Sequence, residues 1–290
     1  IMTISLKLSQ FVIKQKKFIF ENFEYTNFEK LGTGGQAAAF KAMSTVDNCI
    51  VTLRVFLKEV DEYKLERQLQ QLEQQNIPYP YVQHSIRYHE IFIEQKPSTC
   101  ITGKTAIVQV LEYAPKRLQD EIENNTLSQE QQELIIKQLA TALYKMHDNK
   151  LIHRDVKPDN IYLDSENNCL LSDMGICRAS DCSLKTQIGT PSYAAPEIWK
   201  VEFSTDFQSF AKYDTEVDAW SLGCVFYYMQ TGRDLFDGLF GAEQIEKFLG
   251  EETFQDFDPF VQSLLQKLVI IDSQQRKTNW EELRGELEIK

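Results

Sequence analysis

The sequence predicts an α+β protein in which a sheet-rich first part with one helix precedes a mainly helical second part. Up to about residue 113, segments rich in aromatic and β-branched residues end in turn residues, a pattern typical of strands. After Ala114 and Pro115, apolar residues recur at helical spacing instead. A chain of 290 residues is long enough for a domain of two lobes.

Five segments of the first part are predicted to be strands, and they are residues 11–20, 25–35, 49–57, 86–94 and 105–113. Residues 95–104 are predicted to form the hairpin loop between the last two of these strands. Residues 59–75 predict one amphipathic helix, because Leu65, Leu69 and Leu72 share a face and the glutamines cover the solvated side.

Two helices are predicted most strongly in the second part. Ser128 and Gln131 have capping-box spacing at the start of a helix over 127–147. An apolar stripe follows, formed by Ile135, Leu139, Ala142, Leu143 and Met146. Residues 216–232 are apolar nearly all round, which predicts a buried helix that contains Asp218.

Composition excludes several classes of protein. The net charge of −12 argues against nucleic-acid or anionic-membrane binding. No apolar run approaches the roughly 18 residues of a membrane span, and no secretory signal is present. Six scattered cysteines predict reduced thiols in a cytoplasmic compartment. An Ile before Met2 suggests that the sequence starts within a longer protein.

The segment 151–163, LIHRDVKPDNIYL, concentrates polar groups between two apolar flanks. Phosphoryl transfer needs a carboxylate near the acceptor hydroxyl, a cation near the phosphate and oxygen ligands for Mg²⁺. Asp155, Lys157 and Asn160 can supply these groups, and Asp173 offers a second metal ligand.

Five motifs occur in a fixed order along the chain, namely His153–Asp155, Lys157, Asn160, Asp173–Gly175 and Ala195–Glu197. This series resembles the signature of eukaryotic protein kinases, and the resemblance covers roughly residues 25 to 280. The resemblance implies a bilobal protein-kinase-like fold with an antiparallel N-lobe sheet. It implies an N-lobe over 25–113, a C-lobe over 114–290 and a strand-like extension over 1–24. Lys157 with Gly189 and Thr190 resembles the serine/threonine class.

The resemblance implies that Asp155 and Lys157 are catalytic and that Asn160 and Asp173 hold Mg²⁺. It assigns ATP binding to nine residues, which are Gly32, Gly34, Ala39, Thr52, Arg54, Glu66, Glu112, Ala114 and Tyr162. Leu111 falls at the gatekeeper position. Thr186 is a candidate phosphorylation site for an upstream kinase, and Arg154 is the residue that would pair with its phosphate.

Two further pairings follow from the same resemblance. Asp218 is expected to hold the backbone of the loop His153–Asp155, because a buried carboxylate must find donors. Glu197 is expected to pair with Arg276.

Arg54 departs from the family pattern, which has a phosphate-binding lysine in this strand. Arginine keeps the charge but replaces a compact ammonium with a longer planar fork, so weaker activity is expected. Lys41 in the preceding strand is an alternative cation, and Glu62 is an alternative to Glu66. Ala37 stands where a third glycine is usual, and residues 200–214 form an insert.

Two functions therefore stand side by side. The first is ATP- and Mg²⁺-dependent phosphorylation of serine and threonine hydroxyls in protein substrates. The second is a pseudokinase that acts as a binding scaffold or allosteric partner, which Arg54 favours. A small-molecule or lipid kinase is disfavoured, because GTPSYAAPE (189–197) resembles a segment that docks protein substrates.

Overall fold

The computed structural model describes residues 17–20, 23–33, 37–45, 48–56, 88–94, 106–148, 151–172, 178–179, 191–198, 214–238, 242–251 and 254–288. The described residues divide into two compact units, one made of those up to Ala114 and the other of those from Pro115 onward. Several predictions lie outside the described residues, namely the helix 59–75, residues 200–213 of the insert, Gly34, Glu66, Asp173 and Thr186.

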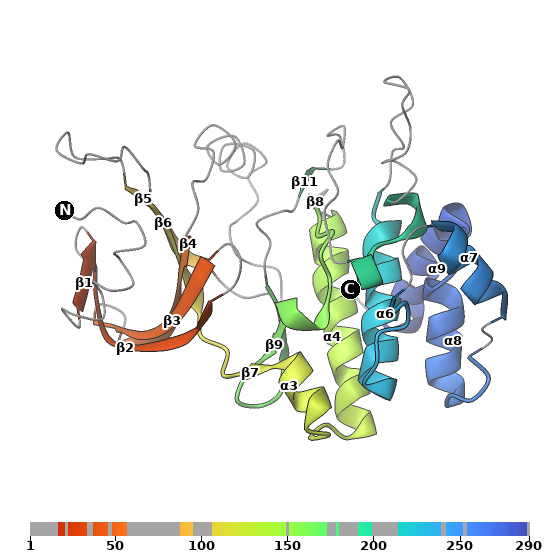
Figure 1. Ribbon diagram of the computed structural model, residues 1–290, viewed down its shortest axis with the longest axis horizontal. Coiled ribbons are helices and arrows are strands. Elements are labelled where there is room, and N and C mark those ends of the chain that lie inside the picture. Colours follow the sequence, from red (N-terminus) through yellow and green to blue (C-terminus); the bar gives the residue numbers. More distant parts are fainter. Residues whose placement is uncertain are drawn as a thin grey trace. The chain divides into compact units, whose positions relative to one another are not determined.

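The first unit contains an antiparallel sheet (Figure 1). Its strands are β1 (Lys17–Phe20), β2 (Phe23–Thr33), β3 (Ala37–Ser44), β4 (Cys49–Phe56), β5 (Tyr88–Glu94) and β6 (Ala106–Glu112). Their spatial order is β1-β2-β3-β4-β6-β5. β3 pairs with β4 from Ala37↔Phe56 to Ser44↔Cys49 without a break. The predicted antiparallel sheet is confirmed.

The two faces of this sheet differ in burial because successive side chains of a strand point to opposite faces. Ala38, Phe40 and Ala42 of β3 are buried, and so are Val51 and Leu53 of β4. The residues between them are only half-buried. One face therefore holds the apolar core of the unit, and most of the described side chains on the other face are less buried.

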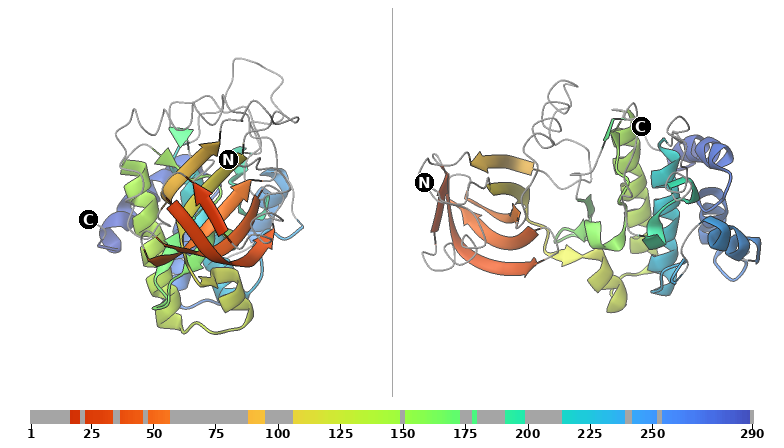
Figure 2. Two further views of the ribbon diagram at one scale, coloured as in Figure 1. Left: turned by 90° about the vertical axis from the view of Figure 1, so that its left-hand side faces the viewer. Right: turned by 45° about the horizontal axis from the view of Figure 1, so that its top comes forward.

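The second unit is mainly helical (Figures 1 and 2). Its helices are α3 (Leu118–Glu123), α4 (Gln129–Asp148), α6 (Glu216–Thr231), α7 (Ala242–Glu251), α8 (Pro259–Leu268) and α9 (Ser273–Glu286). Two 3₁₀ turns are η1 (Pro158–Asn160) and η3 (Pro191–Tyr193), and the short strands are β7 (Lys116–Arg117), β8 (Leu151–Ile152), β9 (Ile161–Leu163), β10 (Cys169–Leu171) and β11 (Arg178–Ala179). The mixed α+β composition matches the prediction.

The start of α4 follows from its sequence. The Ser128 amide donates to Gln131 Oε1 at 2.9 Å, and the Gln131 amide donates to Ser128 Oγ at 3.3 Å. This reciprocal pair is the predicted capping box. The predicted apolar stripe is also confirmed, because all five of its residues are buried.

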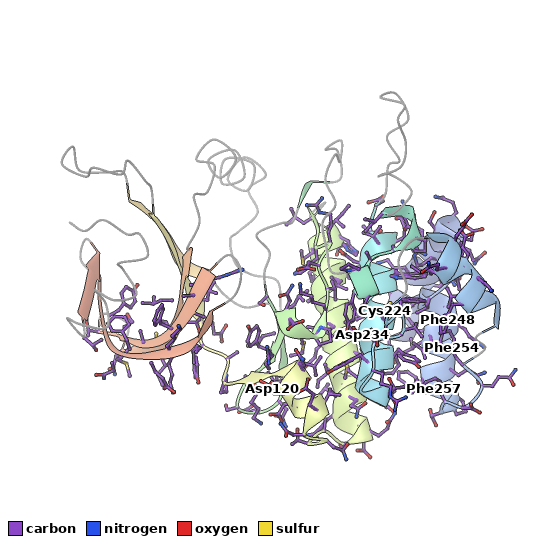
Figure 3. The ribbon with its side chains drawn as sticks, in the orientation of Figure 1. Asp120, Cys224, Asp234, Phe248, Phe254 and Phe257 are labelled. Carbon is purple, nitrogen blue, oxygen red and sulfur yellow. The ribbon has the colours of Figure 1, made fainter. Side chains whose placement is uncertain are left out.

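Helix α6 forms the centre of this unit, and Figure 2 shows it between α4 and α8. Trp220 on α6 stacks on Phe236 with ring centroids 5.2 Å apart. Phe254 and Phe257 pack edge-on against Tyr227 of the same helix, and Phe248 packs edge-on against Phe236 (Figure 3). The helix ends at Gly232, whose φ of 69° is a left-handed conformation that glycine adopts without strain. The predicted buried helix is confirmed.

Gly223 lets α6 and α8 approach closely. A Cβ at this position would lie 2.6 Å from Val269 Cγ2 and 3.0 Å from Leu268 Cβ. We expect Gly223→Ala to lower the free energy of unfolding by about 1–3 kcal/mol, because overpacking strains a dense core. Urea unfolding measures the change.

Gly285 provides the matched control for this prediction, because it is exposed in α9 and a Cβ there would meet nothing within 4 Å. Gly285→Ala should stabilise the protein by up to about 1 kcal/mol, as expected from helix propensity. Equal effects of the two substitutions would contradict close packing at Gly223.

Within the described part of the chain, no helix combines the length and apolar character needed to cross a membrane. Cys49 is half-buried, whereas Cys169 and Cys224 are buried, and none of these three cysteines forms a disulfide.

Candidate active site

The loop between β8 and η1 brings three predicted residues together. Lys157 Nζ lies 2.9 Å from Asp155 Oδ2. Asn160 Nδ2 donates to the Asp155 carbonyl at 2.8 Å and to Asp155 Oδ2 at 2.9 Å. A carboxylate, an ammonium and a carboxamide thus meet within one short loop.

The orientation of the Asn160 amide bears on metal binding. Both donor contacts of Nδ2 go to Asp155, so Oδ1 is the atom left to coordinate a hard cation such as Mg²⁺. Ser172 donates to the Asn160 carbonyl through its amide at 2.8 Å and its hydroxyl at 2.9 Å. The chain just before Asp173 is therefore fixed to Asn160. Among the described residues, no group of three or more His, Cys, Asp or Glu side chains is arranged to hold a metal.

Asp218 anchors the backbone of this loop. Its Oδ2 accepts from the His153 amide at 2.8 Å, and its Oδ1 accepts from the Arg154 amide at 2.7 Å. His147 Nε2 lies 2.9 Å from Oδ2 and provides a third contact. Asp218 is completely buried. The prediction that Asp218 holds the loop is confirmed.

The electrostatics of Asp218 follow from these contacts. Burial by itself would raise the pKa of its carboxyl group. The hydrogen bond from His147, the proximity of the two imidazoles of His147 and His153, and donation from the Arg154 amide outweigh burial and lower the pKa of this carboxyl group from its usual 3.8. Asp218 is therefore ionised at neutral pH.

Acid is expected to destabilise the second unit by protonating carboxylates that, like Asp218, have a lowered pKa in the folded protein. Asp148, Asp164, Asp214 and Asp218 all have a lowered pKa in the folded protein. Their stabilisation is fully present above the unfolded value of 3.8 and is lost as the pH falls through the folded values. Urea midpoints should therefore decline below about pH 4, and the decline should be shallower in Asp218→Asn. Midpoints that stay constant down to pH 3 would contradict this expectation.

His153 and Arg154 shape the loop around Asp155. The Asp155 amide donates to His153 Nδ1 at 3.3 Å, so the ring proton is on Nε2, which donates to the Ser172 carbonyl at 2.8 Å. Arg154 has a left-handed φ of 67° and is 4% exposed. Its conformation turns the loop so that successive amides reach Asp218.

In the first unit, three predicted nucleotide-binding residues form one row across the sheet. Gly32 on β2 pairs with Ala39 on β3, which pairs with Arg54 on β4. Cross-strand partners share a face of the sheet. Thr52, two residues before Arg54, lies on the same face in the next row, opposite Lys41 and Leu111.

Lys41 occupies the Thr52 row rather than the Arg54 row. Its Nζ lies 3.6 Å from Glu29 Oε2 and 4.9 Å from the centre of the Tyr113 ring. These contacts engage Lys41 away from the position of the expected lysine.

The other predicted nucleotide-binding residues lie in both units. Glu112 ends β6 and Ala114 ends the first unit, and both are half-buried. Tyr162 belongs to the second unit, on β9, where it pairs with Leu170 and Arg117.

The Glu197–Arg276 pair is confirmed. The fully buried Arg276 guanidinium contacts the Glu197 carboxylate, and its Nε donates to the Glu216 carbonyl at 2.9 Å. It also lies 5.2 Å from the Trp220 ring centre. Burial raises the pKa of the neighbouring Glu216. Arg276 thus links α9 to α6 and to the segment that carries Glu197.

Sequence reasoning missed two supporting residues. His147 contacts Asp218, and its signal was its place on the apolar face of α4, one turn after Leu143. Gln138, also buried, donates to Asn168 Oδ1 at 3.0 Å and accepts from the Cys169 amide at 2.6 Å, which holds β10 against α4. A buried glutamine gives no distinct sequence signal among the other glutamines of this helix.

Comparison with known proteins agrees with this geometry. A family model described as protein kinase domain matches residues 25–286. The SNF1-like protein kinase ssp2 of Schizosaccharomyces pombe is 30% identical over 260 residues, which are 86% of this chain and 41% of that protein. The carbon catabolite-derepressing protein kinase of Candida tropicalis is 27% identical over 263 residues, covering 89% and 38% respectively.

The corresponding kinase of Saccharomyces cerevisiae is 29% identical over 208 residues, 71% of this chain and 28% of that protein. The chain thus spans about two fifths or less of the length of these relatives. Since the family model covers most of the chain, from Tyr25 onward, this protein belongs to the protein kinase domain family.

Proposed function

We propose that this protein transfers the γ-phosphoryl group of ATP to serine and threonine hydroxyls of protein substrates. The contact set of Asp155, Lys157 and Asn160 carries the proposal. Asp155 accepts a hydrogen bond from the acceptor hydroxyl and orients its oxygen toward the phosphorus. Lys157 offsets the negative charge of the phosphoryl oxygens during transfer.

The donor set also suits a magnesium cofactor. Asn160 Oδ1 and the Asp173 carboxylate are the residues that would hold Mg²⁺. When bound, Mg²⁺ neutralises phosphate charge. Asp218 keeps the loop in place through the amides of His153 and Arg154.

For nucleotide binding we propose the sheet face that carries Gly32, Ala39, Thr52 and Arg54, together with Glu112, Ala114 and Tyr162 and with Gly34 and Glu66. Arg54 takes the place of the phosphate-binding lysine and supplies the positive charge of its row. Its longer fork places that charge differently from an ammonium. Catalysis is therefore expected to be slower than with lysine.

Regulation is proposed to act through Thr186. A phosphate there would be added by an upstream kinase, and Arg154 would pair with the dianion. Because acidic residues outnumber Lys and Arg, a protein partner is favoured over nucleic acid. The scattered cysteines suit a reducing compartment such as the cytoplasm.

Phosphotransfer from labelled ATP tests the proposal directly. Label incorporation should be compared between a generic substrate that carries serine and threonine and one that carries only tyrosine. Phosphoamino-acid analysis then identifies the labelled residue type. We expect label on serine and threonine and a loss of at least about 10²-fold in Asp155→Asn. Equal label in the wild type and Asp155→Asn would reject catalysis and favour the scaffold function.

Arg54→Lys separates the two functions further. Restoring an ammonium at this position is expected to raise kcat/KM for ATP by about ten- to hundredfold, because small misplacements at reacting groups are costly. Arg54→Met should lower it. A wild-type rate equal to that of Arg54→Lys would show that the fork serves as well as the ammonium. Mg-ATP-dependent thermal shifts measure nucleotide binding separately.

A further inference from the structure

The buried indole of Trp280 on α9 contacts the support of the catalytic loop. Its Nε1–H donates to His147 Nδ1 at 3.1 Å. Trp280 is 2% exposed and His147 is 8% exposed, so water competes little for this hydrogen bond. A residue near the end of the described chain thus reaches the histidine that contacts Asp218.

This contact fixes the protonation pattern of the imidazole. Because Nδ1 accepts the indole proton, the ring of neutral His147 carries its own proton on Nε2. That nitrogen lies 2.9 Å from Asp218 Oδ2, so it donates to the carboxylate. With the proton on Nδ1 instead, Nε2 would turn a lone pair toward Asp218 and the carboxylate would lose one of its donors.

The indole itself has little freedom to move. Its ring stacks on Tyr144 at a centroid distance of 4.0 Å and an interplanar angle of 12°. The Tyr144 hydroxyl donates to the Trp280 carbonyl, which fixes the backbone of α9 at the same point. His147 packs edge-on against the indole at 5.8 Å. Ring and backbone are therefore held by the same helix, α4.

We propose that Trp280 is a positioning residue for phosphotransfer, acting through the His147 tautomer that donates to Asp218. The series runs from Trp280 to His147, from His147 to Asp218, and from Asp218 to the amides of His153 and Arg154. Asp155 is the next residue along the chain. The catalytic consequence rests on the proposed function, whereas the structural consequence does not.

The wild-type protein provides the first test. Long-range ¹H–¹⁵N correlation spectra should show His147 as the Nε2–H tautomer. Detection of the Nδ1–H tautomer would overturn the proposal, and this measurement needs no variant.

Trp280→Phe provides the second test, because it keeps an aromatic ring over Tyr144 but removes the donor. We expect the Nδ1–H tautomer to become populated and amide exchange at His153 and Arg154 to accelerate by about two- to tenfold. The kcat should fall by a similar factor, while KM for ATP stays unchanged.

Three variants distinguish a positioning role of Trp280 from a general loosening of α9. Arg284→Met removes a contact of the same helix with the Tyr144 ring, at 5.3 Å, and an exposed pair with Asp148, yet leaves the hydrogen-bond series intact. It should leave exchange at His153 unchanged. His147→Gln should stay close to wild type, because a carboxamide can accept from Trp280 and donate to Asp218, whereas His147→Leu should behave like Trp280→Phe or worse.

The readouts also separate this proposal from the proposed function. An inactive wild type would reject phosphotransfer, yet the tautomer and exchange measurements would still decide the role of Trp280. Unchanged tautomer and exchange in Trp280→Phe would overturn the proposal. So would an acceleration that is equally large for the amides of α8.

Discussion

Asp218→Asn is expected to lower both activity and stability severely. The carboxylate accepts from two backbone amides and from His147, and an asparagine offers one oxygen and turns an NH₂ group toward a donor. We expect a loss of about 2–4 kcal/mol in the free energy of unfolding, because buried donors are left unsatisfied. We expect kcat to fall by about 10²-fold, because the loop that carries Asp155 shifts.

Asp214→Asn is the control for this substitution. Asp214 lies just before α6, and its contact with Lys277 at 2.8 Å is partly exposed. Loss of such a pair costs less than about 1 kcal/mol. Urea unfolding and steady-state kinetics on both variants make the comparison. If Asp218→Asn were as mild as Asp214→Asn, the hydrogen bonds to the loop would not be holding it in place.

Arg276→Met is expected to have the largest effect on stability. The side chain is fully buried and contacts the Glu197 carboxylate and two backbone carbonyls, those of Glu216 and Ile270. Its removal leaves the partly buried Glu197 carboxylate without its cation. We expect a loss of about 3–5 kcal/mol, measured by urea unfolding.

A double-mutant cycle tests the reason for that loss. Glu197→Gln in the Arg276→Met background should recover part of the stability, because the uncompensated charge is removed. Arg284→Met, which breaks the exposed pair with Asp148, should cost less than about 1 kcal/mol. Additive effects at residues 197 and 276 would show that the two side chains do not interact energetically.

The sequence predicted those helices whose apolar periodicity and end signals agree with the burial of their side chains in the fold. The α4 capping box and the apolar helix α6 are examples, since periodicity and end signals determined both. Asp218 was predictable because a carboxylate in an apolar helix must find donors. The position of Glu197 opposite Arg276 came from family resemblance, since no local pattern connects residues so far apart.

Contacts made by neutral polar side chains were not predictable in this way. His147 and Trp280 look like ordinary members of helical faces, and their hydrogen bond depends on how α4 packs against α9. Gln138 is one of several glutamines in its helix, and only the fold reveals which of them is buried. The row of Gly32, Ala39 and Arg54 required the strand register, which hydrophobic alternation alone does not fix to one residue.

The long sequence separation between Asp218 and the loop it holds has a consequence for protein synthesis. While a ribosome has made the chain only as far as about residue 200, the amides of His153 and Arg154 have no carboxylate of Asp218 to bind. Trp280 emerges later still, so the loop reaches its final geometry only when translation of α9 is complete. The proposed phosphotransfer is therefore expected to begin only after α9 has been made.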